Sequence, residues 1–173
     1  MSATAQAGEG VKKLAELIRG IKVAMLTTVA EDGSLRSRPM ATQEADFDGT
    51  LWFVTRAGAP KVGEVERDER VCVSYSSPDD QRYVSVSGTA RLVRDRAKVR
   101  ELWCPAHKEW FPQGPDDPEL ALLRVEPERA QYWDFPSGTL VQIAGLVKSV
   151  VTGQPAAAGE HEKLDLRGGP AGP

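Results

Sequence analysis

The sequence has few of the residues from which catalytic centres are usually built. Its 173 residues include two cysteines and two histidines, and neither pair has the spacing of a metal site or of a disulfide framework. It contains no nucleophile-elbow serine, no P-loop and no dinucleotide-binding glycine motif. We expect His107 to be an exposed loop residue rather than a base, and His161 falls in a segment of disordered composition. A cofactor is therefore expected to supply whatever chemistry the protein performs.

An excess of basic residues is also missing. The net charge of −3 argues against a nucleic-acid partner, because binding to a phosphate backbone needs a basic surface. No segment is long and apolar enough to cross a bilayer, and the N-terminal residues do not have the pattern of a signal peptide. We therefore expect a cytoplasmic protein that binds neither nucleic acid nor membrane. A local pocket for an anion is compatible with this overall charge.

The spacing of apolar residues predicts about six strands in hairpin order, with helices before, between and after them. The expected helices cover 9–20, 61–67, 95–103 and 140–151. The first five expected strands cover 22–29, 35–45, 50–55, 71–76 and 83–93, and the segments 120–125 and 131–135 are expected to close the barrel. The order lacks the β-α-β alternation of a doubly wound sheet. It predicts a mainly β fold, an antiparallel six-stranded barrel with peripheral helices.

Composition divides the chain into three parts. Residues 1–8 are small and polar and are expected to be disordered, and residues 9–151 form the single folded domain. Residues 152–173 are rich in Gly, Pro, Ala and charge, so they cannot bury enough apolar surface to offset their ordering entropy. We expect this last segment to be a flexible tail.

Two basic segments are candidate binding sites. The loop 56–61 delivers Lys61 to the start of a helix, where backbone N–H groups and the lysine could meet an anion. An ordinary loop with a solvated lysine fits the same pattern. Arg36 and Arg38 flank a strand position next to Pro39, which cannot donate a ladder hydrogen bond and marks an edge or an irregular point. The backbone there could face a ligand, or the arginines could form an exposed ladder.

Aromatic and acidic clusters leave their roles open. The aromatic residues fit either a hydrophobic core or a stack against a flat ring, and they are Trp103, Trp110, Phe111, Tyr132 and Trp133. Asp116 and Asp117 precede Pro118, so a turn and cap explains them at least as well as an acid–base pair.

Several short segments, in order and spacing, carry a resemblance to a known family. They are Arg38-Pro39-Met40, Leu51-Trp52-Phe53-Val54-Thr55, Pro60-Lys61, the run 83–90, Leu102-Trp103-Cys104-Pro105, the run 110–118 and Tyr132-Trp133-Asp134. From about Val11 to Val151 the chain resembles the pyridoxamine 5'-phosphate oxidase-like FMN-binding split barrels, and within them the general stress protein branch. The resemblance implies a split β-barrel that works as a homodimer, with a flavin at the subunit interface.

The resemblance also implies which residues meet the cofactor, FMN or FAD. The flavin would be lined by Arg38, Pro39, Met40, Thr42 and Gln43 from the second strand, by Val54 and Thr55 from the third, and by Tyr83 from the fifth. Lys61 would pair with the flavin phosphate, and Trp133 would reach the flavin across the dimer interface. FMN and FAD are not distinguished, since an open cleft leaves room for an adenylate. No catalytic residue and no metal ligand follow from the resemblance.

Three departures from the family pattern bear on activity. Ala59 stands where the family often has a small hydroxyl residue, and Arg36 stands where related stress proteins often carry histidine. True pyridoxamine phosphate oxidases follow the tryptophan with an arginine-bearing segment that grips the substrate phosphate. Here no Lys or Arg occurs between Trp133 and Val147. The resemblance therefore implies a flavin protein that is not a pyridoxamine phosphate oxidase.

The resulting expectation is a stress-related flavin-binding protein with oxidoreductase activity that uses a reduced nicotinamide donor. One alternative is a deazaflavin-dependent reductase of the same fold. Another is a flavin-free barrel that acts as an interaction module or binds haem.

Overall fold

The computed structural model describes residues 3–43, 47–135 and 160–167. The helices are α1 (Ala3–Ile18), α2 (Pro60–Arg67) and α3 (Arg96–Leu102), with short 3-10 helices at Pro105–Glu109 and Gly114–Asp116. The strands are β1 (Val23–Val29), β2 (Leu35–Ala41), β3 (Leu51–Arg56), β4 (Arg70–Ser77), β5 (Arg82–Val93), β6 (Leu120–Asp134) and β7 (Glu160–Asp165). None of the helices in the described ranges is long and apolar enough to span a membrane.

The strands form one antiparallel sheet that curls into a barrel open on one side. The order along the sheet is β2-β1-β4-β5-β6-β3, and β7 pairs with β6 outside this path. β2 and β3 are the two ends of the path, and no ladder joins them in the part of the chain that the structure describes. This is the six-stranded split barrel that the sequence predicts, with a seventh strand added to it.

β6 is long enough to have two different neighbours on one edge. Its first part, Leu120–Val125, pairs with β3, and its second part, Arg129–Asp134, pairs with β7. On the other edge it pairs with β5 along its length, with a register shift at Ser87/Gly88. A Cβ at Gly88 would lie 2.1 Å from the backbone oxygen of Glu126, so only glycine fits this irregularity.

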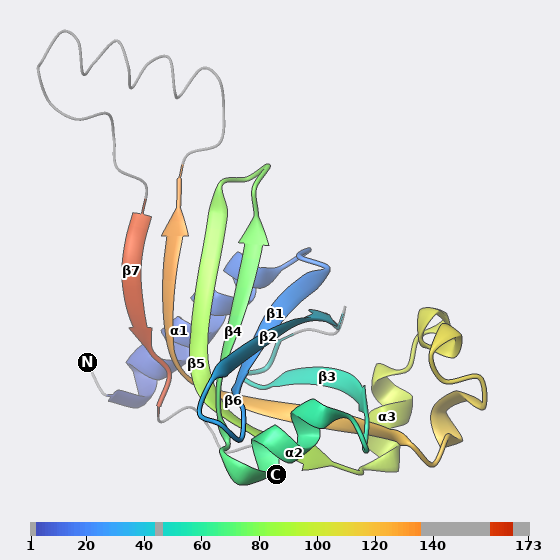
Figure 1. The fold of residues 1–173 in the computed structure, drawn as a ribbon. Coiled ribbons are helices and arrows are strands. Elements are labelled where there is room, and N and C mark those ends of the chain that lie inside the picture. Colours follow the sequence, from blue (N-terminus) through green and yellow to red (C-terminus); the bar gives the residue numbers. More distant parts are fainter. Residues whose placement is uncertain (1–2, 44–46, 136–159, 168–173) are drawn as a thin grey trace, which may run out of the picture.

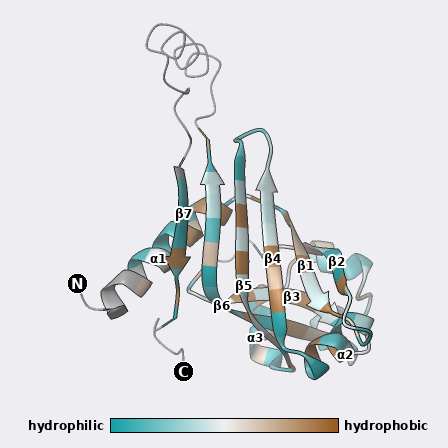
Figure 2. Ribbon diagram, turned by 60° about the vertical axis from the view of Figure 1, so that its left-hand side comes forward, coloured by the Kyte–Doolittle hydropathy of each residue, from teal (hydrophilic) through white to brown (hydrophobic). Residues whose placement is uncertain are grey.

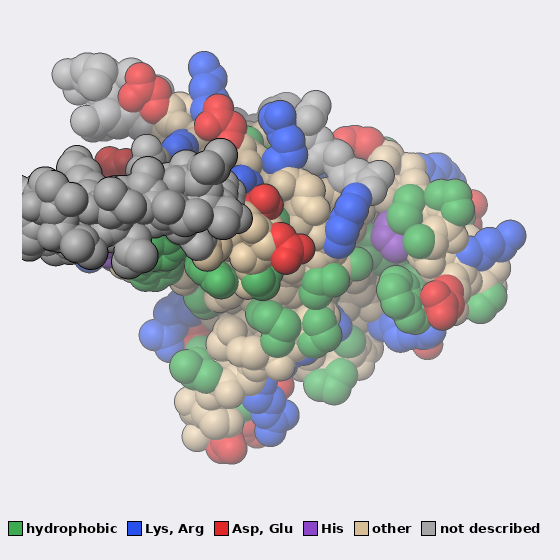
Figure 3. All heavy atoms as spheres, turned by 90° about the horizontal axis from the view of Figure 1, so that it is seen from above, with side chains coloured by type: hydrophobic (Ala, Val, Ile, Leu, Met, Phe, Trp, Pro, Cys, Tyr) green, Lys and Arg blue, Asp and Glu red, His purple; other side chains and the backbone are tan. Residues whose placement is uncertain are grey.

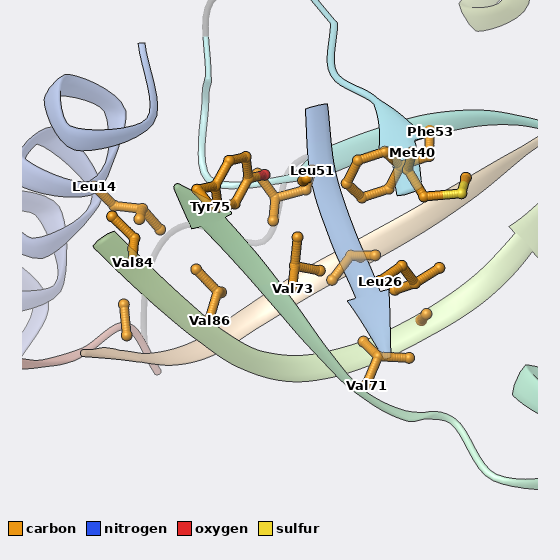
Figure 4. Close-up of a cluster of buried hydrophobic side chains, with 14 of the residues drawn as sticks. Leu14, Leu26, Met40, Leu51, Phe53, Val71, Val73, Tyr75, Val84 and Val86 are labelled. Carbon is orange, nitrogen blue, oxygen red and sulfur yellow. The ribbon is translucent and has the colours of Figure 1, made fainter. Parts of the chain in front are cut away.

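One face of the strands packs into the barrel core. β4 and β5 alternate between buried and more exposed residues, and bands of different hydropathy follow one another along β5 in Figure 2. The buried side chains converge from α1 and from β1 to β6 (Figure 4), and the largest of them include Leu14, Leu26, Phe53, Val73 and Val86. A second cluster lies around Val99 and Leu122, between α3 and the outer side of the β3–β6 ladder.

The turns follow the sequence signals. Gly33 and Gly49 have φ of 80° and 112°, a backbone region that favours glycine, and each follows an aspartate in a turn between two strands. Asp95 caps α3 by accepting hydrogen bonds from the N–H groups of Ala97 and Lys98.

Three sequence expectations differ from the structure. Residues 120–125 and 131–135 belong to one continuous strand, because a bulge rather than a loop accommodates Pro127. α1 begins at Ala3, inside the segment expected to be disordered. The segment 152–173 contains β7, which is held because Leu166 is buried and its N–H donates to the Glu128 carbonyl at 2.8 Å. The helix expected at 140–151 lies outside the described residues.

Candidate functional site at the split

Most of the residues expected to bind a cofactor lie on the two edges of the split. Arg38, Pro39 and Met40 are on the edge strand β2, and Thr42 and Gln43 follow its end. Val54 and Thr55 are on the opposite edge strand, β3. Lys61 lies in the first turn of α2, the helix that directly follows β3. The residues from β2 and from the β3–α2 segment therefore lie on the two sides of the split.

The start of α2 has the features of an anion site. Pro60 occupies the first turn, where its missing N–H costs no helical hydrogen bond, and the capping residue Ala59 offers no side-chain acceptor. The first N–H groups of a helix carry partial positive charge and need partners from outside the helix. Because Ala59 stands where the family often has a hydroxyl residue, its side chain does not cap the first N–H groups of α2. The sequence predicts a phosphate at this position.

A buried carboxylate organises the charges beside this helix. The Glu64 side chain is 4% exposed, and its Oε2 accepts hydrogen bonds from Thr28 Oγ1 at 2.6 Å and from Arg38 Nη2 at 2.7 Å. Arg38 also donates through Nη1 to Thr28 Oγ1, and Arg36 Nη1 lies 3.4 Å from Glu64 Oε1. Burial alone would raise the pKa of Glu64, but the hydrogen bonds from Thr28 and Arg38 outweigh it and lower the pKa. Glu64 is therefore ionised and holds Arg38 in place.

Lys61 belongs to the same cluster. Burial and the positive charge of Arg38 lower its pKa, and Glu64 only partly counteracts them. Arg36, Arg38 and Lys61 thus surround a single carboxylate, which leaves a net of two positive charges at this end of the split. A lysine whose pKa is lowered by a neighbouring cation is a group that a bound anion would stabilise.

The residues on β2 and just after it differ in which of their groups a ligand could contact. Pro39 is exposed on an edge strand, in agreement with its expected position. Met40 is 5% exposed and belongs to the core, so only its backbone is available to a ligand. Thr42 donates its hydroxyl to the Ile21 carbonyl, and Gln43 Nε2 is buried with no hydrogen-bond partner among the residues that the structure describes. An orphaned buried amide donor is a group that a ligand acceptor could satisfy.

The two residues on β3 contribute shape more than polar contacts. Thr55 is buried, and its hydroxyl lies 3.4 Å from the Arg56 carbonyl. Val54 is half-buried and packs against the cluster around Val99 and Leu122. Both lie at the end of β3 from which the chain enters the loop before Lys61.

A cavity of about 620 Å³ adjoins the end of β2. Thr42, Gln43, Tyr75 and Trp52 are among its lining residues, together with the end of α1 and one side of α3. Tyr75 is buried, and this burial raises the pKa of its hydroxyl. Figure 4 shows the Tyr75 ring beside Leu51, which also lines the cavity. The volume lies within the range typical of small-molecule sites.

Tyr83 and Trp133 lie away from the split. They face each other across β5 and β6, whereas the β6 residue in the row of Arg38 is Ala130. Along the curled sheet, β6 is four strands and β5 three strands from β2, and Trp133 lies three residues beyond Ala130 on β6. Among the described residues, neither Tyr83 nor Trp133 forms a hydrogen bond, ion pair or ring contact with the Arg38–Lys61 cluster.

Trp133 instead contacts a residue of β7. Its ring stacks on His161 with a centroid distance of 5.1 Å and an interplanar angle of 8°. His161 is thus part of an ordered strand, and its placement in a disordered tail was wrong.

The structure also shows the surroundings of His107 and of the two adjacent aspartates, Asp116 and Asp117. His107 is buried, not exposed, because the 3-10 turn folds it back so that Nδ1 accepts the Cys104 N–H at 3.1 Å. Burial lowers the pKa of His107. Asp117 accepts the N–H of Glu119, and Asp116 pairs with Arg100, so the turn interpretation of the two aspartates is confirmed.

Sequence reasoning missed Thr28, Glu64 and His161. A threonine in an apolar strand and a glutamate in a polar helix carry no special signal. The spacing of Lys61 and Glu64, three residues apart on one helix, was the one available indication that they share a face.

Comparisons with known proteins agree with this geometry. The sequence model of the family described as "Pyridoxamine 5'-phosphate oxidase like" matches residues 9–156. Protein bli-3 of Neurospora crassa is 30% identical over 164 residues, which cover 89% of this chain and 78% of that protein. General stress protein 26 of Bacillus subtilis is 29% identical over 136 residues, 76% of this chain and 94% of that protein.

Solved structures show the same fold. The general stress FMN/FAD binding protein of Xanthomonas citri is 32% identical, with a TM-score of 0.65 over 76% of this chain and 92% of that one. A general stress protein 26 structure from Jannaschia sp. CCS1 has a TM-score of 0.75 at 22% identity and covers 92% of this chain and 99% of that one. The fold is the FMN-binding split barrel of this family.

Proposed function

Because the chain belongs to the pyridoxamine 5'-phosphate oxidase-like family, in its general stress protein 26 branch, we propose that it binds a flavin nucleotide, FMN or FAD, at the split between β2 and β3. The cluster of Arg36, Arg38 and Lys61 around Glu64 is the observation that carries the proposal. Its net of two positive charges matches the charge of a phosphate monoester, about −1.5 to −2 at neutral pH.

The residues of the split fit the rest of a flavin nucleotide. Arg38 and Lys61 would hold the phosphate with the first N–H groups of α2. The buried Nε2 of Gln43, which has no partner among the described residues, is a donor for a carbonyl oxygen of the ring system, and Pro39 is exposed on the edge strand β2. A bound flavin supplies hydride or single-electron transfer, which the described side chains do not provide.

A homodimer would complete the site. Tyr83 and Trp133 lie on β5 and β6 and not on the two edges of the split, and a second copy would bring them to its flavin. The outer face of β1 and β5 exposes apolar side chains, with Val23, Met25 and Tyr83 at 53%, 40% and 39% exposure. The view from above shows hydrophobic side chains gathered on one face among charged ones (Figure 3). Two-fold dimers are the commonest soluble assembly, and this face offers one an apolar centre.

The activity we propose is reduction of the flavin by a reduced nicotinamide, followed by electron transfer to a small acceptor. The cavity beside Gln43 has room for such a compound. Oxidation of a pyridoxamine phosphate ester does not fit, since no Lys or Arg follows Trp133 before Val147 to hold the ester. A cytoplasmic location remains part of the proposal.

The absorption spectrum of the freshly purified protein tests the proposal. We expect two visible flavin bands, and mass spectrometry of the small molecules released on denaturation should give FMN or FAD. Anaerobic addition of NADH or NADPH should then bleach the bands. A shifted deazaflavin band would instead support a deazaflavin-dependent reductase, and a Soret band or a featureless spectrum that FMN does not change would contradict flavin binding.

A further inference from the structure

β7 comes from a part of the chain to which the family match assigns no role. The match ends at residue 156, and β7 covers Glu160–Asp165. The strand nevertheless pairs with β6 in regular antiparallel register over six residue pairs, including Trp133 with His161. It thus lies directly beside the residue that is expected to reach a flavin on a second copy (Figure 1).

His161 fixes one side of the Trp133 indole. The two rings are nearly parallel, at 8°, with their centroids 5.1 Å apart. Gln131 Nε2 lies 2.7 Å from His161 Nε2 and secures the imidazole from the next outward-facing position on β6.

The position of β7 is set by contacts on the other face of the strand. The Leu166 side chain is 5% exposed, and a Cβ on Gly10 of α1 would lie 2.9 Å from its Cδ2. Tyr132 donates its hydroxyl to Glu162 Oε2 at 3.2 Å. Packing against α1 and β6 therefore determines where His161 stands, independently of the Trp133 stack.

We propose that His161 is a positioning residue of the flavin site: it stacks on Trp133 and holds the indole in the orientation in which it meets the flavin of a second copy. This rests on the proposed function. Outward-facing Tyr83 lies on the opposite flank of Trp133, across the β5–β6 ladder. With β7 in place the indole has the His161 ring stacked on it from one neighbouring strand, and Tyr83 stands opposite it in the register of the other. Preorganisation of this kind raises affinity because the ordering cost is met before the ligand binds.

The test is a double-mutant cycle on flavin affinity. His161→Ala should weaken binding about three- to tenfold, the range for loss of one stacked ring pair, and riboflavin should lose as much as FMN because Trp133 would meet the ring system. His161→Phe keeps the stack and should retain nearly full affinity. Lys163→Ala, on the same strand, is the matched control and should change nothing. In a Trp133→Ala background, His161→Ala should have no further effect.

Each outcome separates the inference from the proposed function. If the unmodified protein binds no flavin, the proposed function fails. If Trp133→Ala weakens flavin binding but His161→Ala does not, the function stands and the positioning role is wrong. Equal losses for His161→Ala and His161→Phe, or an undiminished loss in the Trp133→Ala background, would show that His161 does not act through the stack. Thermal unfolding of each variant identifies losses that come from detachment of β7, which His161→Phe should avoid.

Discussion

Replacing Lys61 should weaken binding of FMN and leave binding of riboflavin almost unchanged. Lys61→Met keeps the apolar stem of the side chain and removes the charge. Lys61 is half-buried at the start of α2, and burial together with the nearby Arg38 lowers its pKa, so an anion at this point would gain a direct charge-assisted contact. Such a contact is worth about 1.5–3 kcal/mol, which corresponds to about ten- to a hundredfold in affinity. Arg38 and the helix N–H groups remain, so the lower half of this range is expected.

Fluorescence titration of the apoprotein with FMN and with riboflavin measures both affinities. Lys12→Met, on the exposed side of α1, is the matched control for loss of one positive charge. Lys61→Arg should restore most of the affinity. The difference between the wild-type protein and Lys61→Met should shrink at high salt, because part of the attraction is screened. Equal losses for both flavins would remove Lys61 from the phosphate site and refute the reasoning.

Two further predictions concern charge. Glu64→Gln should destabilise the fold by about 3 kcal/mol in urea unfolding at pH 7, because Arg38 loses the carboxylate to which it is held. The lowered pKa of Glu64 means that its contribution is full above the ordinary value of 4.5 and is lost as the pH falls through the folded-state pKa, so the gap between wild type and variant should narrow in acid. A gap that stays constant down to pH 3 would mean that Glu64 is not ionised. With saturating FMN, the protein should form no pyridoxal phosphate from pyridoxamine or pyridoxine phosphate above a cofactor-only control, and detectable product would show that a phosphate ester is held without a basic residue after Trp133.

The barrel was predictable because its strands obey local rules. Four predicted strands agree with the structure to within one residue at both ends, namely 22–29, 50–55, 71–76 and 83–93. Alternation and tight turns determine each of them separately. β6 was divided in two because Pro127 suggests an interruption, whereas the bulge opposite Gly88 absorbs it. β7 was missed because its residues are mostly charged, and only the pairing with β6 and the burial of Leu166 stabilise it.

The site was predictable in part. Lys61 and Arg38 were identified from local patterns and from the resemblance, and the structure brings them together through Glu64. Glu64 itself could not be identified from the sequence. Its contact with Thr28 forms only when α2 packs against β1, and Thr28 lies 36 residues earlier in the chain. Met40 was identified from the resemblance, but its side chain is buried in the core. Its expected contact with the cofactor can therefore involve only the backbone.

The proposed division of the site between two chains has a consequence that a mixing experiment can detect. Lys61→Met and Trp133→Ala should each weaken flavin binding, one through the phosphate and the other through the ring. If every site combines Lys61 of one chain with Trp133 of the other, a mixed dimer has one doubly defective site and one intact site. Unfolding the two variants together and refolding them should therefore restore wild-type affinity to about a quarter of the sites, since random pairing makes about half of the dimers mixed. Separately refolded variants, combined without subunit exchange, are the control. If no high-affinity fraction appears although the mixed dimers form, Trp133 serves the flavin of its own chain or none, and the distance between β6 and β2 would have to be bridged by a rearrangement of the sheet.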